Sequence, residues 1–317
     1  MMIHTAHLFI ELTPEHVYHK DSNHGKWMSF NQIMKLNNFI GISARQYKSH
    51  GVYRCSIIID VTKILNSGFI VEADYWRIKR FVKLSLKMVY GDESLYDHHN
   101  LIRIDYRIDR KVPKAIDREL YLLLYNKTKS NFKRLKKQNN YKTTIYHSCK
   151  SIQTTIYDKN EHCKYQNREP MEWERDMIRF EIRLKNPHIY NRVKGTGEIK
   201  CLYSFFKIDV FQEYVQKYLL QIFPSGDFYC YDLAEELISS SKYSLTVRRR
   251  LKHFLGKVSK GNLDTPLNKF YPDSIKKDAY NKRLQNFKEL NLNPITIPQA
   301  YKIDKLPSLL DITCLQM

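Results

Sequence analysis

The stretch LIRIDYRID, residues 101–109, alternates apolar and ionic side chains with a period of two, and this pattern predicts a β-strand. The stretch MIRFEIRL, residues 177–184, repeats the pattern. In both stretches one face is apolar and suits helices packed behind a sheet. The opposite faces carry the ionic residues Arg103, Asp105, Arg107 and Asp109 of the first strand and Arg179, Glu181 and Arg183 of the second.

A third strand is predicted at residues 151–157, SIQTTIY, where the same alternation places Tyr157 on the ionic side. Glu161 follows four residues later and returns to the side of Tyr157 whether the chain stays extended or turns helical. If the three strands are neighbours, Asp105, Glu161 and Glu181 gather around one divalent cation, and carboxylate oxygens suit Mg²⁺ or Mn²⁺. Such a cation would neutralise the oxygens of a phosphodiester attacked by the Tyr157 hydroxyl.

The same alternation is also typical of a plainer structure. Acids and arginines on neighbouring strands form cross-strand salt bridges on a solvated sheet face. Tyr157 would then be one surface tyrosine among the 23 of the chain. Spacing alone leaves both interpretations open.

The remaining pattern predicts the fold class. Further extended segments are expected at residues 3–12 and 53–61, with an amphipathic helix at residues 73–89 and another helix after Pro113. The C-terminal part is expected to hold helices at residues 209–222, 232–239, 245–255 and 275–290. We therefore predict an α+β fold: a curved, mainly antiparallel sheet with helices on one face in residues 1–200, and a mainly helical region in residues 201–317.

The charge balance predicts a polyanionic partner. Lys and Arg number 53 against 33 Asp and Glu, so the formal net charge of +20 surrounds the protein with a positive field. The 23 tyrosines among these cations favour nucleic acid over an anionic membrane, because rings stack on bases. No acid occurs between residues 120 and 157, a run that we interpret as a solvated helix end or loop or as a phosphate contact. Its central basic residues are Lys127, Lys129, Lys133, Arg134, Lys136 and Lys137.

Cysteine usage and hydropathy bear on the compartment. The six cysteines form no C-x-x-C pair, which favours a reducing compartment and argues against a disulfide framework. No apolar run approaches the roughly 20 residues of a membrane span, and the start MMIHTAHLFIEL lacks the flanks of a signal peptide. We therefore expect a cytoplasmic protein without a membrane partner.

A second DNA contact is predicted at residues 231–256, which read as two short helices joined by SSSKYS. Ser244 is the expected N-cap of the second helix, with Leu245, Val247 and Leu251 facing inward. The pattern resembles a helix-turn-helix. An ordinary basic helix packed on the first domain explains it equally well. The basic residues of the second helix are Arg248, Arg249, Arg250 and Lys252.

The segments RIDYRID (103–109), TTIYDKNEH (154–162) and IRFEIRLKN (178–186), in this order, resemble the replication initiators of filamentous phage, the gene II protein type. They resemble more loosely the rolling-circle initiators of Gram-positive plasmids and the relaxases of conjugative transposons. In that group an R-I-D strand, a Y-x-K-x-x-E segment and an R-F-E strand recur. The segment AYNKRLQNFKELNLNPITIP (279–298) resembles the end of some such proteins.

The resemblance implies a nucleophilic Tyr157 with Lys159 beside it, and acidic metal positions at Asp105, Glu161 and Glu181. It implies nicking at a double-strand origin, a 5′-phosphotyrosyl link, a free 3′-hydroxyl that primes synthesis, and no nucleotide cofactor. The expected partners are origin DNA with an inverted repeat or hairpin, a host helicase and a second copy of the chain. A conjugative relaxase shares this chemistry, and a non-catalytic helix-turn-helix regulator is the alternative from another class.

Histidines complete the candidate ligands. Better-known initiators with this chemistry hold their metal with a His-hydrophobic-His pair, which this sequence lacks at any strand. His98 and His99 directly precede the first ionic strand, so they are candidate accessory ligands, with solvated loop histidines as the alternative. The His16, His19 and His24 cluster is a weaker candidate, because nothing in the sequence places it near Tyr157.

Overall fold

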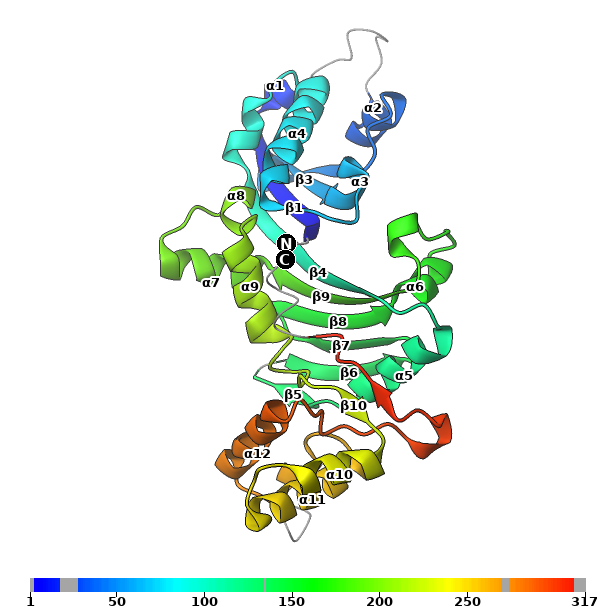
Figure 1. The fold of residues 1–317 in the computed structure, drawn as a ribbon. Helices are drawn as coiled ribbons and strands as arrows, with labels where there is room; N and C mark the ends of the chain where they lie inside the picture. Colours follow the sequence, from blue (N-terminus) through cyan, green and yellow to red (C-terminus); the bar gives the residue numbers. More distant parts are fainter. Residues whose placement is uncertain (1–2, 18–27, 134, 269–273, 311–317) are drawn as a thin grey trace.

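A nine-stranded antiparallel sheet forms the centre of the described part of the protein. The computed structural model describes residues 3–17, 28–133, 135–268 and 274–310. The strands lie in the order β2-β3-β1-β4-β9-β8-β7-β6-β5, and they bend along their length, as β8 and β9 show in Figure 1. Each neighbouring pair is antiparallel, so the predicted α+β fold with a curved antiparallel sheet is confirmed.

The strands of the central sheet have these bounds: β1 Ile3–Leu12, β2 Ile42–Ser49, β3 Val52–Asp60, β4 Asn100–Lys111, β5 Asn131–Phe132, β6 Leu135–Tyr141, β7 Thr144–Ser148, β8 Ile152–Asp158 and β9 Met177–Lys185. The three strands with an ionic face, β4, β9 and β8, are direct neighbours in the middle of the sheet. This adjacency confirms the condition on which the predicted site depended.

The acid-free run was interpreted as a solvated helix end or loop or as a phosphate contact, but part of it forms three strands of the sheet, β5, β6 and β7. The segment LKKQNNY of β6 has no alternation of apolar and polar residues, so its sequence carries no strand signal. The pairing of β6 with β7, and of β7 with β8, makes it a strand. Pairing with neighbouring strands, rather than local sequence, therefore makes β6 a strand.

Helices pack against one face of the sheet, and a further helix, α6 Lys159–Tyr165, lies over the other face. The N-terminal and central helices are α1 Pro14–Val17, α2 Phe30–Leu36, α3 Val61–Leu65, α4 Tyr75–Tyr90, α5 Ala115–Asn126, α6 Lys159–Tyr165, α7 Asn186–Thr196, α8 Leu202–Phe205 and α9 Ile208–Tyr218. Tyr106, on the apolar face of β4, packs against Tyr214 of α9 with ring centroids 5.9 Å apart and donates a hydrogen bond to the Phe205 carbonyl. Tyr125 of α5 packs edge-on against Phe180 of β9 at 5.5 Å. These contacts form a continuous core behind the ionic strands.

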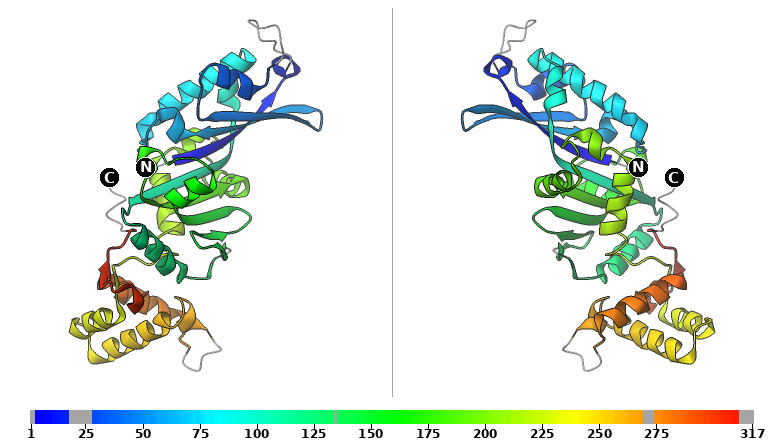
Figure 2. Two further views of the ribbon diagram at one scale, coloured as in Figure 1. Left: turned by 90° about the vertical axis from the view of Figure 1, so that its right-hand side faces the viewer. Right: turned by 90° about the vertical axis from the view of Figure 1, so that its left-hand side faces the viewer.

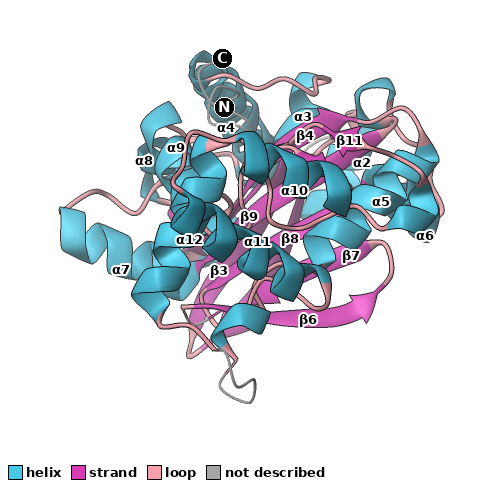
Figure 3. Cartoon of the chain, turned by 60° about the horizontal axis from the view of Figure 1, so that its bottom comes forward, coloured by secondary structure: helices cyan, strands magenta, loops and turns pink. Residues whose placement is uncertain are grey.

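The C-terminal helices α10 Tyr231–Ser240, α11 Leu245–Ser259 and α12 Lys277–Glu289 gather at one end of the molecule, below the sheet in Figures 1 and 2 and in front of it in Figure 3. A small sheet of β10 Phe228–Tyr229 and β11 Lys305–Leu306 accompanies them. They attach through the end of α5, where the Leu263 N–H donates to the Lys127 carbonyl at 2.8 Å. Within the described residues, no helix has both the length and the apolarity needed to cross a bilayer.

Candidate functional site

Strand register brings the ionic residues together on the face opposite the apolar core. In the β4–β9 and β8–β9 ladders the opposed pairs are Asp105 with Arg183, Arg107 with Glu181, Asp109 with Arg179, and Tyr157 with Arg179. Residues opposite each other in an antiparallel ladder share a face. We call this set the ionic face.

Tyr157 makes the central contact of the ionic face. Its hydroxyl donates a hydrogen bond of 2.7 Å to the Glu181 Oε1 atom. The Tyr157 side chain is 4% exposed, so the outward face expected of a solvated strand is in fact covered here. Burial raises the pKa of the Tyr157 hydroxyl well above its ordinary range, and the negative charge of Glu181 acts in the same direction. The hydroxyl therefore needs an adjacent base to lose its proton near neutral pH.

His4 also reaches the ionic face, and the sequence pattern missed it. Its Nδ1 atom lies 3.6 Å from the Glu181 Oε1 atom. Between Ile3 and Thr5 the β1–β4 register shifts, and His4 is the extra residue of this bulge. Burial, together with the positive charges of Arg179 and Arg107, lowers the pKa of His4 well below its ordinary value. The imidazole is therefore neutral, the form in which histidine binds metals or accepts a proton.

Two buried arginines, Arg107 and Arg179, flank Tyr157 and form ion pairs with Asp109 and Glu181. Arg179 binds Asp109 through two hydrogen bonds of 2.7 and 2.9 Å. Arg107 donates from Nη2 to the Gly68 carbonyl at 2.7 Å. The buried Nε and Nη1 atoms of Arg107 and Nη1 of Arg179 have no hydrogen-bond partner among the described residues. Two of these nitrogens lie in longer ion pairs, Arg107 Nε at 3.5 Å from Asp109 and Arg179 Nη1 at 3.9 Å from Glu181. Because none of the three makes a hydrogen bond to the described residues, they can still donate to an anion that enters the face.

The segment after β8 covers the ionic face. Asp158 caps α6 by accepting hydrogen bonds from the Asn160 and Glu161 N–H groups. The His162 ring of α6 packs against the Tyr157 ring with centroids 4.8 Å apart. The Lys159 Nζ atom lies 6.0 Å from the Tyr157 ring centroid and 3.0 Å from Glu174, which belongs to the 3-10 helix η3 Glu172–Glu174. Lys159 therefore lies beside Tyr157, as the motif predicted, but its charge is paired with Glu174.

The three predicted metal carboxylates are not gathered together. Glu161 lies on α6, and its carboxylate forms an ion pair of 2.6 Å with Lys164. The Asp105 side chain is 1% exposed and is bound by Arg103 and by Arg183, the latter at 3.1 Å. In the part of the chain that the structure describes, no three His, Cys, Asp or Glu side chains form a group that could hold a metal ion. Glu181 and His4 remain as a pair of ligand-type atoms beside Tyr157.

The other candidate histidines have structural partners. His99 is buried, its Nε2 atom accepts a hydrogen bond of 2.8 Å from the Leu202 N–H, and its Nδ1 atom contacts the Tyr96 carbonyl. His98 is exposed at the end of the 3-10 helix η2 Ser94–His98. His16 lies 3.3 Å from Asp92, whereas His19 and His24 lie outside the described residues. His99 thus has both ring nitrogens engaged by the backbone.

The predicted phosphate-binding residues occupy two regions. Arg103 and Arg183 are half-buried around Asp105. Lys136 is exposed on β6, Lys137 binds the Asn126 carbonyl, and Arg134 lies outside the described residues. Lys133 lies at the end of β5, with its Nζ atom 5.5 Å from the Tyr218 ring centroid.

The predicted helix pair is formed by α10 and α11, joined by residues 241–244. Ser244 occupies the N-cap position of α11 without a side-chain capping bond, and Leu251 is buried as predicted. Leu245 was wrongly expected to face inward, because it is 63% exposed in the first turn of the helix. Arg249 and Arg250 are exposed, Arg248 binds the Ser241 carbonyl, and Lys252 lies 3.5 Å from Glu235.

Replacement of Arg248, Arg249 and Arg250 by Ala should weaken duplex DNA binding and lower the slope of log affinity against log salt by roughly 2 to 3, one unit for each lost phosphate contact. Fluorescence anisotropy at several salt concentrations measures this slope. The control replaces Lys79, Lys83 and Lys87 of α4 by Ala, because these lysines already pair with Asp97 or Glu93. An unchanged slope in the α11 variant would show that α11 makes no phosphate contacts and serves only to pack against the rest of the protein.

The cover of the ionic face depends on Glu174, which binds Lys159 and also Arg168 at 2.6 Å. Although burial acts in the opposite direction, the hydrogen bond from Arg168 and the charge of Lys159 lower the pKa of Glu174. Removing one partner of a buried ion pair costs about 3 kcal/mol of unfolding free energy, so we expect this loss for Glu174→Gln at neutral pH. Denaturant unfolding of this variant and of Glu172→Gln, an exposed neighbour, measures the difference.

The pH dependence of this loss has a definite sign. A carboxyl group whose folded-state pKa is depressed stabilises the fold above its unfolded pKa of about 4.3 and loses that contribution as the pH falls. The stability difference between wild type and Glu174→Gln should therefore shrink below about pH 4. A difference that stays constant from neutral to acidic pH would contradict the ion-pair explanation.

Comparison with known proteins does not identify a family for this chain. No protein-family model matches the chain, and no curated protein matches it significantly.

Proposed function

We propose that this chain is a rolling-circle replication initiator that nicks one DNA strand with Tyr157. The observation that carries the proposal is the 2.7 Å hydrogen bond from the Tyr157 hydroxyl to Glu181, beside Arg107 and Arg179, whose buried guanidinium groups keep nitrogens that make no hydrogen bond to the described residues. A phosphodiester is an anion, and guanidinium groups are well suited to bind its oxygens. A nucleophile, a proton acceptor and anion donors thus lie side by side.

The proposed reaction is a transesterification at one phosphodiester. The Tyr157 oxygen bonds to phosphorus while its proton passes to Glu181. The bond from phosphorus to the 3′ oxygen breaks, and that oxygen leaves as a hydroxyl after taking up a proton from water. The 5′ phosphate stays on Tyr157, so the energy of the cut bond is retained for rejoining. Arg107 and Arg179 stabilise the charge on the non-bridging oxygens.

A divalent cation is part of the proposal. The Glu181 carboxylate and the neutral His4 imidazole are the side chains on the ionic face that fit it, because the Glu181 Oε1 atom accepts the Tyr157 hydrogen bond and the His4 Nδ1 atom lies 3.6 Å from that oxygen. Mg²⁺ or Mn²⁺ bound there would act as a Lewis acid toward the phosphate. Asp105 is less suited to this role in the present arrangement, because two guanidinium groups already occupy its oxygens.

The substrate needs access to a covered nucleophile. Arg107 holds the Gly68 carbonyl, and Gly68 lies so close to Trp173 of η3 that an added Cβ would come within 2.7 Å of the Trp173 Cβ atom. The loop that contains Gly68 and the 3-10 helix η3 thus meet over the ionic face. A DNA strand reaches the Tyr157 hydroxyl only when this cover shifts. DNA entering the face would compete with Gly68 for the Arg107 guanidinium.

The test is cleavage of a supercoiled plasmid that carries the DNA flanking the gene, including any inverted repeat, with Mn²⁺ or Mg²⁺ present. We expect an open circle with protein bound to the 5′ end and a 3′ end that a polymerase extends. A non-catalytic regulator would bind this plasmid and leave it supercoiled. Transfer of the bound strand to a recipient origin, rather than extension, would favour a conjugative relaxase.

A further inference from the structure

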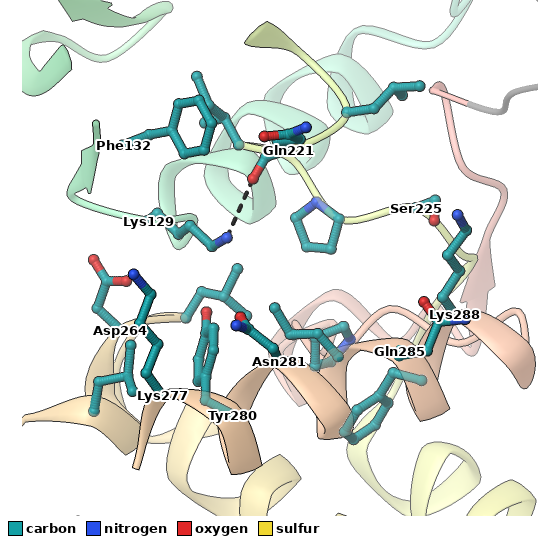
Figure 4. Close-up of a pocket in the computed structure, with 18 of the residues that line it drawn as sticks. Lys129, Phe132, Gln221, Ser225, Asp264, Lys277, Tyr280, Asn281, Gln285 and Lys288 are labelled. Carbon is teal, nitrogen blue, oxygen red and sulfur yellow. Dashed lines mark hydrogen bonds between the residues drawn. The ribbon is translucent and has the colours of Figure 1, made fainter. Parts of the chain in front are cut away.

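A cavity of about 630 Å³ lies between the β5 edge of the sheet and the C-terminal helices, away from the ionic face (Figure 4). Lys129 and Phe132 contribute from the start of the β5 hairpin, Gln221 from the segment after α9, and Tyr280 from α12. Both the acid-free run and the segment 279–298 therefore line it. The volume is sufficient for a small organic ligand.

Aromatic rings and a cation face the interior of this cavity. The Lys129 Nζ atom lies 6.0 Å from the Phe132 ring centroid and 5.8 Å from the Tyr280 ring centroid. It also donates a hydrogen bond of 3.2 Å to the Gln221 carbonyl. Figure 4 shows Lys129 between the two rings. A flat ligand entering here would meet a ring for stacking and an ammonium group within the same space.

The Tyr280 hydroxyl has no hydrogen-bond partner among the described residues. Tyr280 is 2% exposed, lines the cavity and makes no hydrogen bond through its hydroxyl to any described residue. In Figure 4 this hydroxyl points from α12 toward the interior of the cavity. Buried tyrosine hydroxyls normally find a partner, so a polar ligand atom would remove a cost that the unliganded protein bears.

The charge of the cavity favours an anion. Its lining residues include four lysines and one acid, namely Lys129, Lys133, Lys277, Lys288 and Asp264. Asp264 already accepts a hydrogen bond of 2.6 Å from the Ser130 N–H. Burial lowers the pKa of Lys129, and Asp264 opposes this shift only in part. An anionic group would stabilise the ammonium groups.

We propose that this cavity binds one nucleotide of a single-stranded nucleic acid, with the base against Phe132 and within reach of the Tyr280 hydroxyl, and with the phosphate held by the lysines. The amide side chains of Asn281 and Gln285 line the cavity and offer donors and acceptors for a base edge. The lining of the cavity indicates that its ligand is a nucleotide. That this nucleotide belongs to a DNA strand rests on the proposed function, because a free mononucleotide would make the same contacts.

The cavity is separate from the Tyr157 site. Phe132 lies in β5, three strands from β8, or roughly 14 Å across the ladder. A strand cut at Tyr157 would be held at a second point by this cavity. Such a contact would retain an unpaired strand without reading its sequence.

The first test is photo-crosslinking of the full-length chain to an oligothymidylate that contains 5-iodouracil, followed by peptide mass spectrometry. We expect crosslinks at Phe132. Crosslinks confined to other aromatic residues would overturn the proposal. The Tyr157→Phe variant should give the same crosslinks, so failure of the nicking proposal would leave this result intact.

The second test compares variants by anisotropy with a labelled oligothymidylate. Phe132→Ala should weaken binding by about ten-fold, because stacking on an aromatic side chain contributes that much per base. Lys277→Ala should weaken it several-fold, whereas Lys282→Ala, an exposed residue of the same helix outside the cavity, should bind like wild type. Tyr280→Phe keeps the ring and the fold, and it should bind more weakly through loss of the hydroxyl.

Competition identifies the source of the nucleotide. If an unlabelled oligothymidylate displaces the probe far better than thymidine 5′-monophosphate does, the cavity serves a strand. Equal displacement would support a free mononucleotide in the same site. Equal binding by wild type, Phe132→Ala, Lys277→Ala and Tyr280→Phe would show that the cavity binds no nucleotide and would overturn the proposal.

Discussion

Tyr157→Phe is expected to abolish the covalent protein–DNA adduct while fold and DNA affinity remain close to wild type. Phenylalanine keeps the ring that packs against His162, but it has no oxygen to bond to phosphorus. The lost hydrogen bond to Glu181 should cost only about 1 kcal/mol of unfolding free energy. The measurement is a denaturing gel of each protein incubated with a labelled single-stranded origin and Mn²⁺.

Two other tyrosines provide matched controls. Tyr146 of β7 pairs with Thr155 of β8, so it lies on the same side of the sheet as Tyr157. Tyr165 is 84% exposed at the end of α6. The variants Tyr146→Phe and Tyr165→Phe should form the adduct like wild type. If the adduct persists in Tyr157→Phe and disappears in either control, the assignment of the nucleophile is wrong.

The sequence could predict the ionic face because each residue of a β-strand points to one of only two faces of the sheet. Once residues 101–109 and 177–184 are strands with one apolar face, a core behind them forces Asp105, Arg107 and Glu181 to the other side. Tyr157 follows by the same rule in β8. Adjacent charges of opposite sign then favour the observed register, with Asp109 opposite Arg179.

The alternation could not predict where bulges and covers occur. Counting back from the apolar Ala6 by twos places His4 on the apolar face, and only the bulge after Ile3 turns it toward Glu181. Burial of the ionic face depends on Gly68 and Trp173, which are far from β8 in the sequence. These contacts arise from tertiary packing that no local pattern encodes.

The position of Glu161 also could not be predicted from its spacing in the sequence. Its spacing from Tyr157 suggested a shared side, yet Asp158 starts α6 as an N-cap and the chain changes from strand to helix there. In the first turn of this helix Glu161 is three residues before Lys164, the spacing at which helical side chains meet, and the two form an ion pair. A local partner therefore holds the carboxylate that the motif assigned to the metal.

Glu181→Gln is expected to lower the nicking rate by roughly 10²- to 10⁴-fold, the usual contribution of a positioned base, while origin binding survives. Glutamine has the same shape and can accept the Tyr157 hydrogen bond, but it cannot take up the proton. Because the pKa of Tyr157 is raised well above its ordinary range, raising the pH to 9 should not restore the rate. The measurement is single-turnover cleavage of a labelled origin across pH and Mn²⁺ concentration.

The Mn²⁺ series separates two roles of Glu181. If its main role is to hold the cation with His4, excess Mn²⁺ should recover much of the Glu181→Gln rate, and His4→Gln should show the same recovery. If Glu181 acts as the base, saturating Mn²⁺ leaves the loss of rate in place.

The control variant is Glu161→Gln. The Glu161 carboxylate is paired with Lys164 on α6, so this substitution should leave the nicking rate close to wild type. Loss of nicking in Glu161→Gln as complete as in Glu181→Gln would mean that the bound cation draws Glu161 onto the ionic face, against the arrangement of Glu181 and His4 proposed here.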